Sequence, residues 1–257
     1  MCEIFGFSGK QKNKLNSDLQ IFYSHAEKHP NGWGLALFDN NKSDIFRETK
    51  RADRSDYLKK LLSKPVYAKT ALAHIRLATI GNVEPENCHP FTKTDKNGIM
   101  WTLVHNGTVF ESDKLSRYVF SQSGETDSER ILLYIIDRIN ERSEKLKRVL
   151  TFRERFKIID EIIRTSSAKN KLNLLIYDGD ILYVHTNFRN SLYFREDEYG
   201  ITFSTQELSG SNWKNVPMNV LLGYCNGSHL FSGTHHNNEH FFDPDAYKPL
   251  YMAYSGL

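Results

Sequence analysis

Cys2 is the first residue whose chemistry needs an explanation, because it directly follows the initiator methionine in the opening stretch MCEIFGF. If Met1 is removed, the thiol of Cys2 and a free α-amine belong to the same residue. An α-amine has an unperturbed pKa of about 7.7 to 8.0, so it can accept the thiol proton near neutral pH. Cys2 is therefore a candidate nucleophile with its own base; the alternative is a buried cysteine in an apolar strand.

The dipeptide Asn106-Gly107, in VHNGTV, could stabilise the oxyanion that forms when a thiolate attacks a carbonyl. The asparagine side-chain amide and the next backbone N–H can both point at one oxygen, and glycine lets a substrate approach the backbone closely. The alternative is a hairpin turn, for which Asn-Gly is the commonest sequence.

Arg76 lies in the strand-like run AHIRLAT, where a charge must be paired or must bind an anion. Its guanidinium could grip a substrate carboxylate with two parallel hydrogen bonds, or it could form a structural salt bridge. Asp127, in GETDSE, stands where a helix is expected to begin. It could accept hydrogen bonds from a substrate ammonium, or it could simply complement the helix dipole.

Two other groups are weaker candidates. Cys88 and His89 are adjacent, so in an extended chain their side chains point to opposite faces and make a poor nucleophile–base pair. The stretch GTHHNNEHFF contains His235, His236, His240 and Glu239, whose spacing would suit a metal ion on a helix. Its asparagines and the preceding SGT favour a polar surface loop.

Short apolar, partly alternating runs predict the strands that must position these residues. They cover residues 2–9, 32–39, 71–79 and 101–107. Two later segments each have two apolar arms around a turn dipeptide, Asp178-Gly179 and Asn226-Gly227, and predict tight hairpins.

Helices are predicted at residues 17–29, 126–141 and 155–165. The second has one apolar stripe, formed by Ile131, Leu132, Ile135, Ile136 and Ile139. Thr126, followed three residues later by Glu129, predicts a capping box at its start. The charged segment 140–157 favours a solvated helix over a linker or a nucleic-acid patch. Strands at both ends with helices between them indicate an α+β fold with mostly antiparallel sheets.

Composition limits the function classes. A chain of 257 residues with 39% apolar and 25% charged residues suits a soluble globular protein, and its net charge of +3 favours no nucleic-acid partner. No uncharged apolar run approaches the roughly 18 residues that span a bilayer, and the N-terminus lacks a secretory signal. Three widely spaced cysteines make a disulfide framework unlikely and favour a reducing, cytoplasmic setting.

The order of the motifs resembles the class-II glutamine amidotransferases of the N-terminal-nucleophile hydrolase group. The motifs are an N-terminal Cys followed by NGWG, HIRLAT, NCHP, HNG and GETDSE, and they cover residues 2–129. The likeness is greatest to stand-alone members that open with Met-Cys-Glu. A weaker match, TFSTQEL, extends it to Leu208.

The resemblance implies a role for each matching residue. Cys2 corresponds to the nucleophile, and Asn106 and Gly107 correspond to the oxyanion hole. Arg76 corresponds to the residue that grips the α-carboxylate of glutamine, and Asp127 to the one that holds its α-ammonium. The remaining matches are Thr79, which helps line the carboxylate pocket, and Gly32 and Trp33, in a loop that approaches the site.

The implied fold is a four-layer αββα sandwich of two antiparallel sheets, here as a single domain over residues 1–257. The implied reaction is hydrolysis of the γ-amide of glutamine or a γ-glutamyl compound through a thioester, without a metal or organic cofactor. Two alternatives stay open: a glutaminase subunit that passes ammonia to a separate synthase partner, and a catalytically silent binding subunit. Leu77 and Ile80 stand where larger amidotransferases usually have Trp and His, which affects details of the pocket rather than the reaction.

Overall fold

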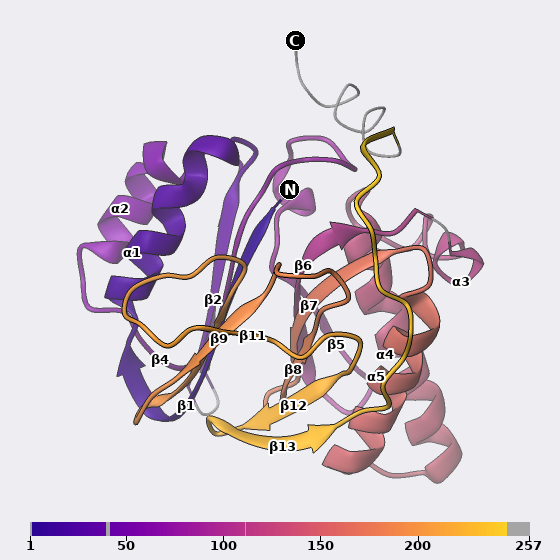
Figure 1. Ribbon diagram of the computed structural model, residues 1–257. Helices are drawn as coiled ribbons and strands as arrows, with labels where there is room; N and C mark the ends of the chain where they lie inside the picture. Colours follow the sequence, from indigo (N-terminus) through magenta and orange to yellow (C-terminus); the bar gives the residue numbers. More distant parts are fainter. Residues whose placement is uncertain (1, 40–41, 111, 246–257) are drawn as a thin grey trace.

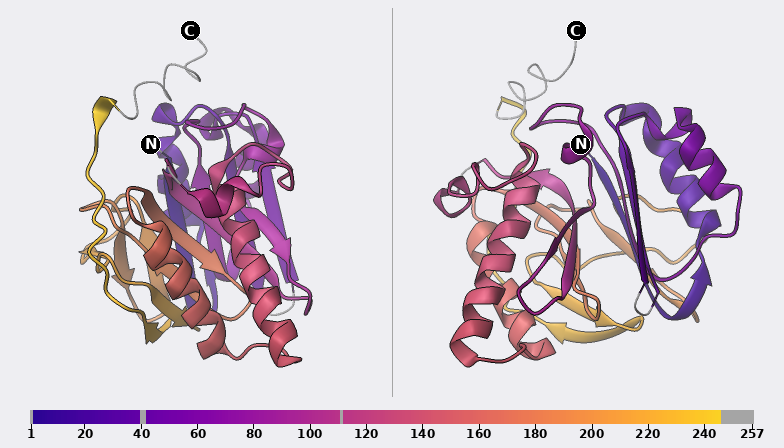
Figure 2. Two further views of the ribbon diagram at one scale, coloured as in Figure 1. Left: turned by 90° about the vertical axis from the view of Figure 1, so that its right-hand side faces the viewer. Right: turned by 180° about the vertical axis from the view of Figure 1, so that it is seen from behind.

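Two β-sheets packed face to face form the centre of the molecule, and helices cover their outer faces (Figure 1). The computed structural model describes residues 2–39, 42–110 and 112–245. Helices α1 and α2 lie outside one sheet and α4 and α5 outside the other, as the view from behind in Figure 2 also shows. This arrangement confirms the predicted α+β sandwich of two antiparallel sheets.

The first sheet has the strand order β11-β9-β10-β1-β4-β2-β3, with every pairing antiparallel. Its strands are β1 (Glu3–Lys14), β2 (Trp33–Asp39), β3 (Lys42–Glu48), β4 (Tyr67–Ile75), β9 (Tyr193–Glu196), β10 (Gly200–Ser204) and β11 (Lys214–Asn215). Glu3 pairs with Ile75, so the start of β1 lies beside the end of β4. Cys2 and Arg76, far apart in sequence, are thereby brought to the same end of the sheet.

The second sheet has the order β13-β12-β8-β7-β6-β5 and is also antiparallel. Its strands are β5 (Phe91–Thr94), β6 (Met100–Thr108), β7 (Lys171–Tyr177), β8 (Leu182–His185), β12 (Leu222–Cys225) and β13 (Ser228–Ser232). Both predicted hairpins are present: Gly179 has φ +91° between β7 and β8, and Asn226 and Gly227 have φ +50° and +73° between β12 and β13.

Helices occupy the two outer layers and the connections between strands. Their bounds are α1 (Asn16–Ser24), η1 (His25–Lys28), η2 (Ala52–Arg54), α2 (Asp56–Leu62), η3 (Pro85–Asn87), α3 (Asp113–Ser116), α4 (Asp127–Leu146) and α5 (Phe152–Ser166). Among the described residues, no helix is both long enough and apolar enough to cross a membrane.

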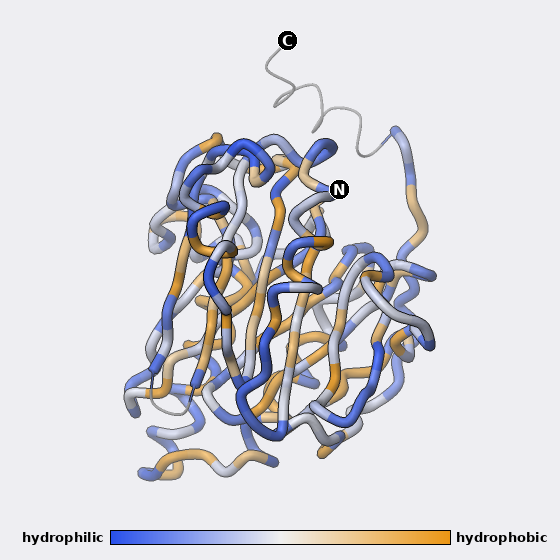
Figure 3. The backbone as a smooth tube through the Cα atoms, turned by 90° about the vertical axis from the view of Figure 1, so that its left-hand side faces the viewer, coloured by the Kyte–Doolittle hydropathy of each residue, from blue (hydrophilic) through white to orange (hydrophobic). Residues whose placement is uncertain are grey.

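The alternation of side chains along the strands divides the core into layers. In β1, Ile4 belongs to the cluster between the two sheets, whereas Phe5 belongs to the cluster under α1 and α2. A Cβ on Gly6 would lie 2.8 Å from Leu175 of the opposite sheet, so glycine permits close approach of the sheets there. Figure 3 shows hydrophobic stretches along the strands and hydrophilic stretches in many connecting loops.

Helix α4 confirms the predicted apolar stripe, all five members of which are buried. Its start differs from the predicted capping box. Thr126 accepts a hydrogen bond from the Glu129 backbone N–H, but the Glu129 carboxylate accepts from Ser123 and Gly124 instead of from Thr126. Glu129 thus ties the preceding loop to the helix, a use of the carboxylate that the four-residue pattern cannot distinguish from a capping box.

The charged segment 140–157 is not one solvated helix. Helix α4 ends at Leu146, Lys147 takes a left-handed conformation with φ +54°, and α5 begins at Phe152. At the start of α5, Thr151 and Glu154 form a complete capping box. Helical spacing of apolar residues continued across the break, which is why the sequence pattern did not reveal it.

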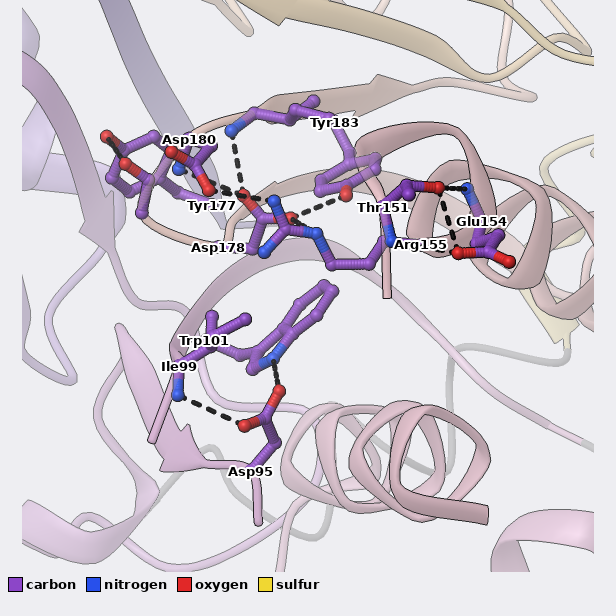
Figure 4. Close-up of polar contacts among 12 residues, drawn as sticks. Asp95, Ile99, Trp101, Thr151, Glu154, Arg155, Tyr177, Asp178, Asp180 and Tyr183 are labelled. Carbon is purple, nitrogen blue, oxygen red and sulfur yellow. Dashed lines mark hydrogen bonds and ion pairs between the residues drawn. The ribbon is translucent and has the colours of Figure 1, made fainter. Parts of the chain in front are cut away.

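An ion-pair cluster around the buried Arg155 joins the start of α5 to the β7–β8 hairpin (Figure 4). Arg155 lies 3.2 Å from Asp178 and 2.8 Å from Asp180, measured between nitrogen and carboxylate oxygen. Tyr183 donates to Asp178 over 2.6 Å. Nearby, Trp101 donates its indole N–H to Asp95 over 3.1 Å.

Candidate active site

The layer between the sheets changes from apolar to polar at one end, and most of the predicted site residues lie there. Side chains two positions apart share a face of a strand, so Cys2 is on the face of Ile4, and Asn106 is on the face of Val104. Ile4 and Val104 both belong to the apolar cluster between the sheets. Cys2 and Asn106 therefore face the same space between the two sheets.

The thiol of Cys2 is held by the backbone just beyond β4. Its Sγ donates to the Leu77 carbonyl over 3.2 Å and accepts from the Leu77 N–H over 3.3 Å. Burial raises the pKa of the Cys2 thiol, while the Leu77 hydrogen bond and the positive charges of Arg76 and Lys171 act in the opposite direction. The thiol is thus mainly protonated unless a base acts on it. Met1, whose removal the predicted mechanism requires, lies outside the described residues.

Asn106 and Gly107 lie inside β6, paired with Asn173 and Leu172 of β7, and do not form a hairpin turn. A Cβ on Gly107 would lie 2.0 Å from the Lys171 carbonyl oxygen and 2.3 Å from His105 Nε2. Only glycine fits this position without displacing the neighbouring strand. The oxygen of the Asn106 side chain accepts a hydrogen bond from Lys171 Nζ over 3.1 Å.

His105 stabilises the same strand segment from the other face. Its Nε2 lies 3.0 Å from the Lys171 carbonyl oxygen, which can only accept, so this nitrogen carries the proton. Nδ1 then accepts from the Ser128 hydroxyl over 2.9 Å. Burial lowers the pKa of His105, which keeps the ring neutral. His105 therefore joins β6, β7 and the first turn of α4.

Arg76 is 3% exposed, and its guanidinium donates to a loop backbone. Its two terminal nitrogens reach the carbonyl oxygens of Ile80, Gly81 and Asn82 at distances of 3.1, 2.7 and 2.8 Å. Among the described residues, no carboxylate lies within ion-pair distance of it. The structure thus gives Arg76 a loop-holding role, and its charge has no carboxylate partner within the part of the chain that the structure describes.

Asp127 is the first residue of α4, and its carboxylate contacts the backbone just beyond β6. Oδ2 accepts from the Val109 backbone N–H over 2.7 Å, and Oδ1 lies 3.4 Å from the Ser128 hydroxyl. The residue lines a pocket together with Val109, Phe110, Ser112, Asp113, Leu115, Ser116 and Arg130. A carboxylate on a pocket wall is available to a ligand cation, in addition to its contribution at the helix N-terminus.

The three remaining predicted site residues differ in position. Thr79 is half-buried in the loop that Arg76 holds. Gly32 has φ +122°, and its carbonyl oxygen accepts from the Arg76 N–H over 2.8 Å, which places it beside the end of β4. Trp33 is 0% exposed in the core under α1 and α2, with its ring against Tyr23 and Tyr57. Its side chain packs in the core instead of facing the inter-sheet space.

Cys88 and His89 lie in separate environments. Cys88 Sγ is 3.5 Å from the Glu84 carbonyl oxygen, whereas the ring of His89 lies against that of His74, with centroids 4.0 Å apart and the planes tilted by 32°. Burial lowers the pKa of both histidines well below the usual value.

Residues 233–239 form neither helix nor strand, in agreement with the predicted loop. His236 Nε2 lies 3.0 Å from Nε2 of the buried His185, and Glu239 pairs with Arg189. Within the described residues, no group of three or more His, Cys, Asp or Glu side chains is arranged to hold a metal ion.

Sequence reasoning missed Lys171. This first residue of β7 is 1% exposed, donates to Asn106 and lies with its ammonium 4.7 Å from the centroid of the Phe188 ring. Burial lowers the pKa of Lys171 to about 7. The available signal was the run KLNLLIY, a charge at the head of an apolar strand, the same pattern that singled out Arg76.

Comparisons with known proteins agree with the fold and the motif order. Residues 1–209 match the family described as glutamine amidotransferases class-II. YafJ of Escherichia coli, which its name assigns provisionally to the glutamine amidotransferases, is 27% identical over 196 residues, covering 73% of this chain and 74% of YafJ. An uncharacterized protein of Methanocaldococcus jannaschii is 24% identical over 259 residues, covering 90% of this chain and 71% of that protein.

Solved structures show the same architecture. Glutamine phosphoribosylpyrophosphate amidotransferase from B. subtilis superposes with a TM-score of 0.65 at 19% identity, covering 90% of this chain and 48% of that one. At this identity the likeness supports the fold alone. Because the family match spans most of the sequence, the chain belongs to the class-II glutamine amidotransferases, which act on the amide of glutamine.

Proposed function

We propose that this protein hydrolyses the γ-amide of glutamine or of a γ-glutamyl compound through a thioester on Cys2, releasing glutamate and ammonia or an amine. The observation that carries the proposal is the position of Cys2 at the polar end of the inter-sheet layer. There, the Leu77 backbone holds Sγ, and Lys171 acts electrostatically on the thiol while contacting Asn106. Family membership supports chemistry on a glutamine amide.

The proposed reaction begins after Met1 has been removed. The α-amine of Cys2 takes the thiol proton, and the thiolate attacks the γ-carbonyl carbon to form a tetrahedral oxyanion. The C–N bond breaks as the leaving amine takes a proton from the α-ammonium. Water then adds to the thioester with the α-amine as base, the C–S bond breaks, and glutamate and the free thiol form.

Asn106 Nδ2 and the Gly107 N–H are the proposed oxyanion donors. Hydrogen-bond donors that are already oriented towards the developing charge stabilise the transition state, and losing one costs about 100- to 1,000-fold in kcat. The contact with Lys171 leaves the NH₂ end of the Asn106 amide for this role.

Arg76 and Asp127 are the proposed recognition pair for the amino-acid head of the substrate. Arg76 has a charge that no described carboxylate neutralises, and Asp127 lines a pocket at the start of α4. A cation and an anion select the α-carboxylate and α-ammonium of a glutamyl group. Thr79 and Gly32 are proposed to shape the pocket through the loop and the backbone; for Trp33 we propose only a supporting role, because its side chain is in the core.

The proposal requires a thiol that stays reduced. Cys2, Cys88 and Cys225 are free cysteines in the structure. A reducing cytoplasm maintains such thiols, so we propose that compartment as the site of action.

Mass spectrometry of the intact protein, before and after treatment with a diazo-ketone analogue of glutamine, tests the nucleophile. We expect loss of the methionine mass and a single adduct on Cys2, with no adduct on a Cys2→Ala variant. Retained methionine, or an adduct on Cys88, would refute the mechanism. Release of glutamate from glutamine and from γ-glutamyl peptides is then compared, and no release from any of them would favour a silent binding subunit.

A second candidate function is the supply of ammonia to a separate synthase. The B. subtilis amidotransferase motivates this candidate, because the present chain covers only 48% of that protein. Hydrolysis of γ-glutamyl peptides at least as efficient as that of glutamine would exclude this candidate, since an ammonia donor needs an unsubstituted amide.

A further inference from the structure

Lys171 is a buried cation whose contacts lie around the proposed oxyanion site. Its ammonium donates to Asn106 Oδ1 over 3.1 Å, and its own carbonyl oxygen accepts from His105 Nε2 over 3.0 Å. The same carbonyl oxygen limits the space at Gly107. Through its side chain and its backbone, Lys171 therefore contacts all three residues of the His-Asn-Gly motif.

The contact with Lys171 determines the orientation of the Asn106 amide. An ammonium has three donors and no acceptor, so only the oxygen of the amide can face it. Rotating the amide by a half turn would bring NH₂ against an ammonium and lose the bond. The NH₂ group must then point away from Lys171, and its two donors are directed elsewhere in the inter-sheet space.

The charge of Lys171 also acts on the nucleophile. The positive charge of Lys171 lowers the pKa of the Cys2 thiol, and the Cys2 thiolate raises the pKa of Lys171. Burial lowers the pKa of the Lys171 ammonium to about 7, so its protonation depends strongly on negative charge nearby. Formation of a thiolate or an oxyanion at Cys2 would favour the charged lysine.

A packing role alone does not explain a lysine at this position. Burying an ammonium costs free energy that a methionine of similar length would not cost. The face of Phe188 at 4.7 Å stabilises the charge in part, but it would pack equally well against an apolar chain.

We propose that Lys171 is a positioning residue of the amidase site, holding the Asn106 amide with Nδ2 directed at the oxyanion and adding positive charge near Cys2. This inference rests on the proposed function. Lys171 acts through Asn106, so its removal should lower kcat more than it changes KM.

A double-mutant cycle between Lys171→Met and Asn106→Ala tests the proposal. We expect K171M to lower kcat by about 10- to 100-fold, with KM changed by less than about threefold, and N106A to lower it by about 100- to 1,000-fold. If Lys171 acts through Asn106, K171M in the N106A background should cost no more than about threefold further. Lys157→Met, an exposed position on α5, is the matched control and should leave kcat unchanged.

Each outcome of the cycle is decisive. Multiplicative effects of the two variants, an effect on KM alone, or a K171M enzyme as fast as the wild type would overturn the role of Lys171 while leaving the proposed function intact. A wild type that releases no glutamate from glutamine or any γ-glutamyl peptide would overturn the proposed function and this inference with it. Should K171M fail to fold, the cycle is run with Lys171→Leu, which also has no donor for Asn106, and the same coupling is required.

Alkylation of Cys2 by iodoacetamide gives a readout that does not depend on turnover. The rate rises with the thiolate fraction, so its pH profile reports the pKa of the thiol. K171M should slow alkylation below about pH 7, where Lys171 is mostly protonated and favours the thiolate, and should change the rate little at higher pH, whereas K157M should change neither part of the profile. An unchanged profile in K171M would refute the electrostatic part of the proposal.

Discussion

Two buried arginines, Arg76 and Arg155, have opposite surroundings. Arg155 is 2% exposed and lies between the carboxylates of Asp178 and Asp180 (Figure 4). Arg76 is 3% exposed and donates to three backbone carbonyl oxygens, with no described carboxylate within ion-pair distance. Carbonyl dipoles satisfy its hydrogen bonds without neutralising its charge.

The difference indicates what each arginine does. A buried charge with its own anions is a structural feature whose loss leaves those anions uncompensated. A buried charge without them creates a positive potential in the surrounding space, here at the polar end of the inter-sheet layer near Cys2. Lys171, when protonated, adds a second positive charge to the same end. The half of the molecule with α5 is thus stabilised by paired charge, and the Cys2 end is electrostatically prepared for an anionic ligand or transition state.

The largest effect on stability is expected for Arg155→Met. Removing one partner of a buried ion pair typically lowers the free energy of unfolding by about 3–5 kcal/mol, here because the carboxylate of Asp178 is left buried without its cation. Urea unfolding measures this loss, and the kcat of the folded variant should be unchanged. Adding Asp178→Asn should recover part of the loss; a double variant less stable than R155M would contradict the pairing.

Arg76→Gln should instead affect catalysis. We expect kcat/KM for glutamine to fall by about 100-fold, equivalent to about 2.7 kcal/mol, because a charge-assisted contact with the α-carboxylate is lost. A γ-amide substrate that lacks the α-carboxylate provides the control and should lose much less. Equal losses for both substrates would mean that Arg76 acts only by holding the loop at residues 80–82.

Lys171→Met should make stability less dependent on pH. The pKa of Lys171 is about 7 in the folded protein, against about 10.4 for an unfolded lysine, so between these values the unfolded state binds more protons and wild-type stability rises with pH. The cost of burying Lys171 is therefore greatest below about pH 7, and K171M removes it. We expect the advantage of K171M to be larger by about 3 to 4 kcal/mol near pH 7 than near pH 10.

Thermal unfolding of both proteins at the two pH values measures this difference. An advantage of K171M that does not change with pH, or that grows towards high pH, would show that folding does not lower the pKa of Lys171. K157M serves again as the exposed control and should show no pH-dependent difference from the wild type.

The smallest effect is expected for Thr151→Ala, at the capping box one turn before Arg155. Loss of a threonine N-cap costs about 1 kcal/mol. Thr165→Ala, near the other end of α5, is the matched control and should change stability by less. If T151A were as damaging as R155M, the ion-pair cluster would depend on the helix start more than on the charges themselves.

Much of this molecule could be predicted from local sequence patterns. The alternating strands, the Asp178-Gly179 and Asn226-Gly227 hairpins and the stripe of α4 are confirmed, since each depends on residues close together in the chain. The charged segment 140–157 was wrongly interpreted as one helix, because helical spacing of apolar residues continues on both sides of the break at Lys147. The Glu129 carboxylate accepts hydrogen bonds from the loop before α4 and not from the Thr126 N–H. The spacing of Thr126 and Glu129 in the sequence does not distinguish these two nearby partners.

The sequence by itself determined the fold class and the family, and it proposed Cys2, Arg76, Asn106, Gly107 and Asp127 for the site. Only the tertiary structure decided what surrounds them. It placed Trp33 in the core, turned the guanidinium of Arg76 towards a loop backbone, and put Lys171 against Asn106 from a strand 65 residues further along the chain. Local propensity and motif order are properties of neighbouring residues. The partner of a buried charge depends on which strands pair and in which register, and that is settled only when the two sheets close on each other.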